Sequence, residues 1–275
     1  MPQQNVVAQS LLQPCEPARD CVFEVPEKAA ALAVVIPAFN EVATIRDVAL
    51  RALHQIERVI VVDDGSDDGT AAAVEDLPVV VLRNAAKLGK AATLRRGMVY
   101  ALEQGAGAII TLDGDGQHAP EDIPRLVAAH EQNAGAIVVG ARLHESSRIP
   151  RARYLTNRFG NFWIAWAAGH PLTDSQSGFR LYPATVLRAL RVPDSRSRGF
   201  VWESEILIDA ARAGVKNVSV AVSAIYPADR RRSYFRPVRD FTLIGLMVAR
   251  KILSRGFYVS GLIRSLRRPD GVSHR

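Results

Sequence analysis

The stretch that decides the fold is Gly-Ala-Ile-Ile-Thr-Leu-Asp-Gly-Asp-Gly-Gln-His, residues 107–118. Residues 107–111 are a short apolar run of the kind that forms a buried strand. Asp113 and Asp115 follow it, two carboxylates separated by one glycine. Because like charges this close repel each other, the pair is expected to hold a cation between or beside it. Hard oxygen ligands suit Mg²⁺ or Mn²⁺, and Mg²⁺ usually binds through one or two carboxylates and substrate phosphates. The alternative for an isolated pair is a solvated turn.

The segments around this stretch alternate between strand and helix patterns. The spacing predicts strands over 32–36, 58–62, 79–82, 108–112 and 136–139, and helices over 41–54, 70–76, 89–104 and 121–133. This alternation predicts an α/β fold, a three-layer sandwich with a mostly parallel central sheet. Ligands of such sheets bind at the carboxyl ends of the strands. Four side chains follow predicted strand ends and are expected to form one site: Asn40, Asp64, Asp113 and Arg142.

The composition restricts the partners and the compartment. The chain has 275 residues and a net charge of +7, which favours an anionic partner such as a nucleotide, a nucleic acid or a membrane surface. Acidic side chains at the strand ends would repel a nucleic-acid backbone, so we expect no nucleic acid. Cys15 and Cys21 fit no zinc pattern and are interpreted as free thiols in a reducing compartment. A signal peptide is not recognisable, and no apolar run approaches the ~20 residues that span a bilayer. We therefore expect a cytoplasmic protein.

Motifs at the first two strand ends exclude two common sites. Residues 37–41, Pro-Ala-Phe-Asn-Glu, stand where a dinucleotide site needs G-x-G-x-x-G. Residues 63–70, Asp-Asp-Gly-Ser-Asp-Asp-Gly-Thr, look like a calcium loop, but a strand precedes them where an EF-hand needs a helix. Asp64 is instead expected to accept a hydrogen bond from a nucleobase. Lys90 opens a helix and suits a phosphate, and Arg180 offers a further phosphate clamp.

Four motifs, in this order and spacing, resemble the nucleotide-sugar-binding half of a family-2 glycosyltransferase with the GT-A fold. They are residues 35–41, 62–70, 89–90 and 113–118. Residues 174–180 and 202–205 are similar to the dolichyl-phosphate mannose synthase branch. The resemblance covers residues 32–235.

This resemblance implies roles for particular residues. The donor nucleotide would be bound by Pro37, Phe39, Glu41, Asp64, Lys90 and Asp113. The ligands of Mg²⁺ or Mn²⁺ would be Asp113, Asp115 and Gln117. The catalytic group would be Asp115, Arg142, Asp174, Glu205 and Arg230.

The implied activity is metal-dependent, inverting transfer of a sugar from a nucleoside diphosphate sugar to a lipid-linked acceptor. The branch usually carries a Gly-x-Ser-Lys segment where residues 229–236 read Asp-Arg-Arg-Arg-Ser-Tyr-Phe-Arg, so a polyprenyl phosphate is one acceptor among several. A hydroxyl acceptor would need a carboxylate to take its proton: Glu203, Glu205 or Asp174. The alternatives are a nucleotidyltransferase of similar fold and a non-catalytic nucleotide-binding scaffold.

The chain is expected to have three parts: a flexible amino-terminal segment (1–30), a glycosyltransferase domain (31–235) and a basic amphipathic helical tail (236–275). The apolar runs of the tail are too short to span a bilayer and are interrupted by arginines. Such helices lie in the membrane interface, with arginines at anionic headgroups. We expect peripheral attachment to an anionic membrane surface, the inner face of the membrane. The alternative is that residues 241–253 pack on the domain or pair with a second subunit in a homo-oligomer.

Overall fold

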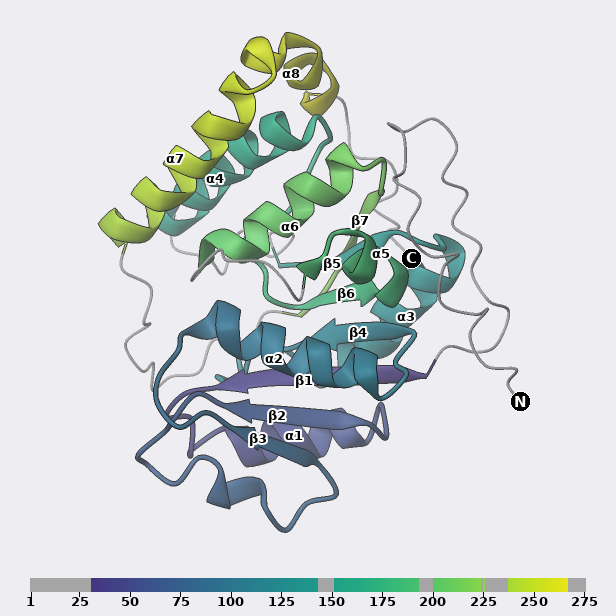
Figure 1. Cartoon of the computed structure of the whole chain (residues 1–275), viewed down its shortest axis with the longest axis vertical. Coiled ribbons are helices and arrows are strands. Elements are labelled where there is room, and N and C mark those ends of the chain that lie inside the picture. The colour runs from purple at the N-terminus through teal and green to yellow at the C-terminus, as the bar shows by residue number, and fades with distance from the viewer. Residues whose placement is uncertain (1–30, 143–150, 193–199, 224, 226–236, 267–275) are drawn as a thin grey trace, which may run out of the picture.

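The computed structural model describes residues 31–142, 151–192, 200–223, 225 and 237–266. Within these residues, the centre is a seven-stranded sheet of order β3-β2-β1-β4-β6-β5-β7 (Figure 1). The strands are β1 (Leu32–Ala38), β2 (Val59–Asp63), β3 (Val80–Arg83), β4 (Ala108–Thr111), β5 (Ile137–Ala141), β6 (Arg180–Pro183) and β7 (Asn217–Ala221). Only the two pairings that involve β6 are antiparallel. The predicted α/β sandwich with a mostly parallel sheet is confirmed.

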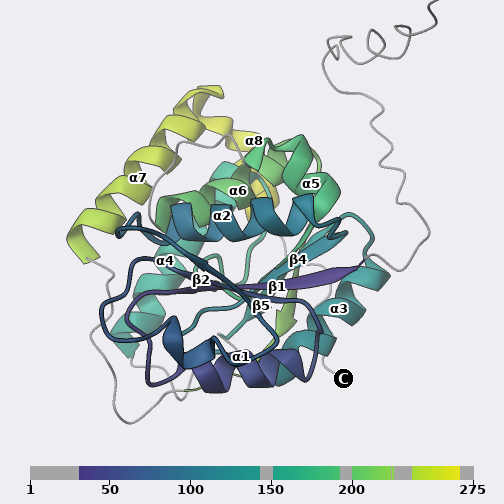
Figure 2. The ribbon, with the colours of Figure 1, turned by 60° about the horizontal axis from the view of Figure 1, so that its bottom comes forward.

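Two helical layers cover the sheet because its central strands are apolar on both faces (Figure 2). The helices are α1 (Ile45–Leu53), α2 (Lys90–Glu103), α3 (Ile123–Gln132), α4 (Arg151–Ala168), α5 (Ala184–Ala189), α6 (Phe200–Arg212), α7 (Pro237–Leu253) and α8 (Val259–Ser265). On β1, Val34 and Ile36 pack in the cluster with α1 and α3. Ala33 and Val35 pack in the opposite cluster with α2, α5 and α6. This alternation follows from the two-residue period of a strand.

A third apolar cluster joins α4 and α7 to the outer side of α6, at the upper end of Figure 1. It contains Ile164, Ala167, Ala168, Ile208, Val248 and Ile252. The turn before α8 is tied to α4, because the indole nitrogen of Trp166 donates a hydrogen bond to the carbonyl of Tyr258 (3.1 Å). Each helix in the described part of the chain is too short or too polar to cross a membrane.

The structure differs from the sequence-based expectation at several elements. β6 and α5 were not predicted, because residues 174–180 read as a polar connection and the four residues of β6 begin with a charged Arg180. The helix predicted over 41–54 begins only at Ile45. Residues 70–76, predicted as a helix, contain a single 3-10 turn, Ala72–Val74.

Some expectations concern residues outside the described ranges. These are the amino-terminal segment with Cys15 and Cys21, the boundary between residues 235 and 236, and the proposed catalytic Arg230.

Gly97 lets α2 lie directly on the sheet. A Cβ atom at this position would be 2.4 Å from Cγ1 of Val35 on β1 and 2.9 Å from Cγ2 of Val62 on β2. Such distances are far shorter than a carbon–carbon contact, so only a glycine fits here. This close packing fixes the height of α2, and therefore of Lys90 at its first turn, above the sheet.

We expect Gly97→Ala to lower the free energy of unfolding by about 1–2 kcal/mol, because overpacking outweighs the better helix propensity of alanine. Gly245→Ala is the matched control: Gly245 lies in α7 with no atom near its missing Cβ. This change should be neutral or stabilising by up to about 1 kcal/mol. Urea unfolding followed by circular dichroism measures both. Equal effects of the same sign would contradict the proposed packing constraint.

Candidate active site

The loops that follow β1 and β2 are joined at the carboxyl edge of the sheet. The backbone N–H of Asn40 donates to Oγ of Ser66 (2.8 Å), and that of Asp67 donates to Oδ1 of Asn40 (3.0 Å). The backbone N–H of Glu41 donates to Oγ1 of Thr70 (2.8 Å). Asn40 has a left-handed backbone (φ 55°), which asparagine tolerates better than most residues. These bonds hold the predicted base and ribose residues of β1 against the loop after β2.

Asp64 fixes the loop that leads into α2. Its buried carboxylate accepts hydrogen bonds from the backbone N–H groups of Leu88 and Gly89 (both 2.8 Å) and from Nδ2 of Asn84 (2.9 Å). A negative charge at this place also complements the amino terminus of α2. Asp64 therefore orders the loop that carries Lys90. Its predicted contact with a nucleobase would be additional to these bonds and stays a prediction.

Phe39 lies at the end of β1 with a cation over its ring. Nζ of Lys87 is 3.5 Å from the ring centroid. This cation–π contact brings the loop after β3 to the predicted base pocket. Pro37 is buried beside it, at the end of the same strand.

The Asp113–Gln117 turn is shaped around the carboxylate of Asp115. Its Oδ1 accepts a hydrogen bond from the backbone N–H of Gln117 (3.0 Å), and its Oδ2 accepts one from Nε2 of Gln117 (2.7 Å). Oγ1 of Thr44 donates to the Gly114 carbonyl (2.7 Å), which ties the turn to the start of α1. Burial and the negative charge of Asp113 raise the pKa of Asp115. The two carboxylates therefore repel each other, and the prediction that they hold a divalent cation stays a prediction.

Lys90 supplies a cation to this pair. Its Nζ lies 2.8 Å from Oδ1 of Asp113 and 3.2 Å from Oε2 of Glu203. Nε2 of the buried His118 is 3.7 Å from Oδ2 of Asp113. Burial by itself would lower the pKa of Lys90 and raise that of Asp113, but their mutual attraction reverses both directions. Asp113 is thus held as a carboxylate before any metal ion binds.

The residues of this turn fit a hard divalent cation. Asp113 and Asp115 supply carboxylates, and the ammonium group of Lys90 occupies a cation position at Asp113. The side-chain amide of Gln117 turns its nitrogen to Asp115, so it would have to rotate for its oxygen to bind a metal ion. Among the described residues, no cluster of three or more His, Cys, Asp or Glu side chains could hold a metal ion. The remaining ligands would come from phosphates and water, as is usual for Mg²⁺.

The antiparallel strand β6 brings a second loop to the same edge. β6 begins beside the end of β4, and Oγ1 of Thr111 donates a hydrogen bond to the carbonyl of Gly178 (2.7 Å). In this loop, Oδ2 of Asp174 lies 3.4 Å from Nε of Arg142 and accepts from its backbone N–H (3.2 Å). The structure thus brings together Arg142 and Asp174, and their catalytic role stays a prediction.

Arg180 is not available to a phosphate, contrary to the sequence-based suggestion. Its guanidinium group is buried and donates to the carbonyls of Ser175 (2.7 Å), Ser177 (2.7 Å) and Glu203 (2.6 Å). It also donates to the hydroxyl of Tyr182 (3.1 Å). Its function in this fold is to join the loop before β6 to α6.

The two glutamates of α6 face different partners. Glu203 faces Lys90, whereas Oε1 of Glu205 lies 3.3 Å from Nζ of Lys251 on α7. A helix turns by about 200° over two residues, so the two carboxylates cannot face the same site. The helical period of the sequence could have shown that Glu203 and Glu205 face different sides of α6. The backbone N–H of Ile225 donates to the carbonyl of Gln117 (3.1 Å), so the chain returns to the Asp113–Gln117 turn after β7.

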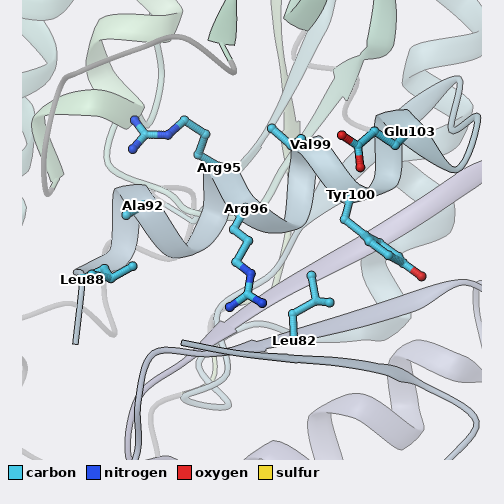
Figure 3. Close-up of a pocket in the computed structure, with 8 residues that line it drawn as sticks. All are labelled: Leu82, Leu88, Ala92, Arg95, Arg96, Val99, Tyr100 and Glu103. Atoms are coloured by element: carbon cyan, nitrogen blue, oxygen red, sulfur yellow. The ribbon is translucent and has the colours of Figure 1, made fainter. Parts of the chain in front are cut away.

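A separate groove runs along the outer side of α2 (Figure 3). It is lined by Leu82, Leu88, Ala92, Arg95, Arg96, Val99, Tyr100 and Glu103. None of the predicted site residues lies in it. Arg96 is hydrogen-bonded there to the carbonyl of Arg83 (2.7 Å) and to Oδ1 of Asn84 (2.6 Å). The strand-end site, and not this groove, is therefore the candidate active site.

Comparison with known proteins finds a matching family and similar proteins. Residues 33–191 match Glycosyl transferase family 2. An undecaprenyl-phosphate mannosyltransferase from Micrococcus luteus is 30% identical over 201 residues, which is 70% of this chain and 82% of the relative. A UDP-N-acetylglucosamine–dolichyl-phosphate N-acetylglucosaminyltransferase from Methanococcus voltae is 28% identical over 215 residues, 70% of this chain and 85% of that protein.

A solved structure extends the comparison to the fold. The crystal structure of glucosyl-3-phosphoglycerate synthase from Mycobacterium tuberculosis with Mn²⁺, UDP and glucosyl-3-phosphoglycerate matches with a TM-score of 0.57. The match covers 82% of this chain and 80% of that chain at 20% identity. At this identity the likeness is one of fold, and it confirms the GT-A fold expected from the motifs.

Gly178 controls how closely the loop before β6 approaches Asp113. A Cβ atom there would be 2.7 Å from Oδ2 of Asp113 and 3.0 Å from Nζ of Lys90. We expect Gly178→Ala to leave the protein folded, because both neighbours are ends of flexible side chains, and to displace the carboxylate. Binding of UDP with Mn²⁺, measured by calorimetry, should weaken roughly tenfold, about 1.4 kcal/mol.

Gly160→Ala is the matched control for Gly178→Ala. Its Cβ would lie 2.7 Å from Nε2 of Gln176, a flexible group of the same loop that is not at Asp113. This variant should bind UDP with Mn²⁺ as the wild type does. Equal losses in both variants would mean that general loop disturbance, and not the Asp113 carboxylate, sets the affinity.

Proposed function

The chain belongs to glycosyl transferase family 2, and we propose that this enzyme transfers a sugar from a nucleoside diphosphate sugar to a polyprenyl phosphate at a membrane surface. The family match sets aside the nucleotidyltransferase alternative. The observation that carries the proposal is the Asp113–Asp115 pair at the carboxyl edge of the sheet, with Lys90 in contact with Asp113. The two relatives are named for undecaprenyl-phosphate and dolichyl-phosphate acceptors, which supports a lipid-linked phosphate.

The donor would lie along the loops that follow β1, β2 and β4. Its base and ribose would meet Phe39, Glu41 and the loop that Asp64 orders. Its diphosphate would reach the carboxylates of Asp113 and Asp115 through Mg²⁺ or Mn²⁺. The Mycobacterium tuberculosis enzyme of the same fold was crystallised with Mn²⁺ and UDP, which supports a divalent cation and a nucleoside diphosphate as ligands.

The transfer would be a single displacement with inversion. An oxygen of the acceptor phosphate attacks the anomeric carbon, the bond from that carbon to the diphosphate oxygen breaks, and the nucleoside diphosphate leaves. The divalent cation would stabilise the charge that develops on the leaving diphosphate. Asp113 and Asp115 would hold that cation, and Lys90 would add a positive charge beside it. Arg142, next to Asp174, would lie toward the acceptor.

The state of the candidate bases supports an acceptor that is already ionised. Glu203 is paired with Lys90, Glu205 with Lys251 and Asp174 with Arg142. Each ion pair would have to open before its carboxylate could accept a proton from a hydroxyl group. A phosphate needs no such base, because it carries a negative charge at neutral pH.

The outward face of α7 supports a membrane location for the acceptor. Val248 and Ile252 bury one side of the helix. Leu243, Leu246 and Leu253 are 42%, 63% and 56% exposed, and the helical period places them on the other side. A surface helix of a globular protein normally carries polar residues on the side that faces the solvent. On α8, Val259 and Ile263 are exposed in the same way.

Basic residues accompany these apolar side chains. Arg250 shares the exposed side of α7 with the leucines, and Arg255 and Arg264 are exposed around α8. Apolar groups interleaved with arginines suit the interface of an anionic bilayer. We therefore propose peripheral attachment through the surface formed by α7 and α8.

Aromatic residues of α4 connect this surface with the site. Phe159, Phe162 and Trp163 share an exposed side of the helix, and Trp163 stacks on Trp166, which is bonded to Tyr258 before α8. On its buried side, α4 holds the loop of Asp174: the Asn161 side chain donates to the carbonyl of Thr173 (2.7 Å) and accepts from the N–H of Ser175 (2.9 Å). We propose that this exposed aromatic side receives the apolar chain of the acceptor.

The activity is tested with undecaprenyl phosphate in detergent, Mn²⁺ and a set of UDP and GDP sugars, with lipid-linked sugar detected by mass spectrometry. We expect product, and a loss of roughly a hundredfold or more in kcat for Asp115→Asn, because the leaving diphosphate loses its cation. Asp47→Asn, at an exposed carboxylate of α1, is the control and should keep the wild-type rate.

Two results would contradict the proposed activity. Turnover with a soluble phosphate acceptor such as 3-phosphoglycerate, and none with the polyprenyl phosphate, would reject the acceptor class. Binding of UDP with Mn²⁺ and no turnover of any donor would favour the non-catalytic scaffold.

Membrane attachment is tested by sedimentation with vesicles rich in phosphatidylglycerol. We expect the full chain to pellet with these vesicles at low salt and to be released by about 1 M salt, where the Debye length falls to about 3 Å. Leu246→Glu should reduce the bound fraction severalfold. Leu88→Glu is the matched control, because both leucines are 63% exposed and Leu88 lies on the groove of α2. Protein that ignores anionic vesicles, or equal losses in both variants, would refute the attachment surface.

A further inference from the structure

We propose that Lys90 and Glu203 form a charge-exchange pair for the metal site. The ammonium group of Lys90 holds Asp113 while no metal ion is bound, and it stays with Glu203 and leaves Asp113 when a divalent cation binds Asp113. Glu203 is thus a positioning residue, which acts on the metal ion through Lys90. The inference rests on the proposed function in one respect, that a divalent cation binds at Asp113.

The geometry places one cation between two carboxylates. Nζ of Lys90 lies 2.8 Å from Oδ1 of Asp113 and 3.2 Å from Oε2 of Glu203. The shorter distance gives the stronger bond, so Lys90 belongs mainly to Asp113 in this state. The backbone of Gly178 closes one side of the group, since a Cβ there would be 3.0 Å from Nζ. A small movement of Nζ is enough to exchange one carboxylate for the other.

Because the ammonium group of Lys90 is buried, it needs the carboxylate of Glu203 once it leaves Asp113. The side chain of Lys90 is only 20% exposed, and that of Glu203 only 8%. An ammonium group and a divalent cation on the same carboxylate repel each other, so metal binding drives Lys90 away from Asp113. A desolvated ammonium group without an anionic partner is costly. Glu203 offers that partner without requiring Lys90 to reach bulk water.

The fold keeps Glu203 in place for this exchange. Its backbone carbonyl accepts a hydrogen bond from Nη1 of the buried Arg180 (2.6 Å), and the adjacent Trp202 is packed in the core between α6 and the sheet. Lys90 lies in the first turn of α2, whose loop is ordered by Asp64. Both partners therefore start from fixed backbone positions, and only the flexible lysine side chain has to move.

The alternative is a static ion pair, which predicts the opposite change in metal affinity when Lys90 is removed. If Lys90 only keeps the Asp113 carboxylate in position, its removal weakens metal binding. If Lys90 competes with the metal ion, its removal strengthens metal binding. Loss of Glu203 weakens metal binding in the exchange because Lys90 then stays on Asp113. That effect should vanish when Lys90 is also absent, whereas a simple loss of negative charge would persist.

The test is Mn²⁺ binding to the full chain without any nucleotide, measured by electron paramagnetic resonance of free Mn²⁺. We expect Lys90→Met to bind Mn²⁺ roughly tenfold more tightly and Glu203→Gln roughly tenfold more weakly, each about 1.4 kcal/mol. In the Lys90→Met background, Glu203→Gln should change the affinity little. Lys87→Met is the matched control: it removes the same charge three residues away, from a lysine that lies over Phe39, and should leave Mn²⁺ binding nearly unchanged.

The outcomes separate this inference from the proposed function. Mn²⁺ binding that is unchanged or weaker in Lys90→Met overturns the exchange and leaves the metal site intact. If Mn²⁺ binds only in the presence of UDP, the same variants are compared with UDP present. Absence of Mn²⁺ binding under both conditions, in the wild type and in Lys90→Met alike, overturns both. If Lys90→Met fails to fold because Glu203 is left buried and unpaired, the charge-balanced double variant is compared with Glu203→Gln. The double variant should then bind Mn²⁺ more tightly, and equal or weaker binding rejects the exchange.

Discussion

The buried guanidinium group of Arg180 holds together the parts on which the site depends. It opens β6, the antiparallel strand between β4 and β5, and it donates to carbonyls of the preceding loop and of Glu203 on α6. A buried charge is tolerated only when such bonds satisfy it. Because β6 runs against its neighbours, its loop arrives at the edge where the parallel strands end. Gly178 reaches Asp113, and Glu203 reaches Lys90, as consequences of this one arrangement.

Electrostatics then organises the site without any ligand. Asp113 and Asp115 repel each other. Lys90 offsets this repulsion at Asp113, and two hydrogen bonds from Gln117 stabilise the carboxylate of Asp115. The groups that would meet a metal ion and a diphosphate are therefore held in place before binding. Such preorganisation reduces the reorganisation that a reaction requires. A divalent cation that binds at Asp113 would have to compete with the ammonium group of Lys90.

One of the helices outside the sheet contacts a loop of the polar site on one side and carries an exposed apolar surface on the other. α4 contributes to both, because Asn161 binds the loop of Asp174 while Phe159, Phe162 and Trp163 are exposed on its other side. α7 and α8 continue the apolar surface with leucines, other aliphatic side chains and arginines. A transferase for a phosphate on an apolar chain needs both environments within the length of one substrate.

The sequence by itself determined the sandwich, most of its strands and the edge at which the site lies, because periodicity and strand-end motifs are local properties of a chain. The motifs also indicated Asp113 and Asp115 as a cation site, and the structure places Lys90 there. Local pattern did not reveal β6, the bonds of Asp64 to the loop before α2, or the choice between Glu203 and Glu205 at Lys90. The position of β6 depends on strand order, and the choice of glutamate depends on α2 and α6, which meet although Lys90 and Glu203 are 113 residues apart in the chain. Only the tertiary structure decides such contacts, since packing and not local sequence selects which distant side chain satisfies a buried charge.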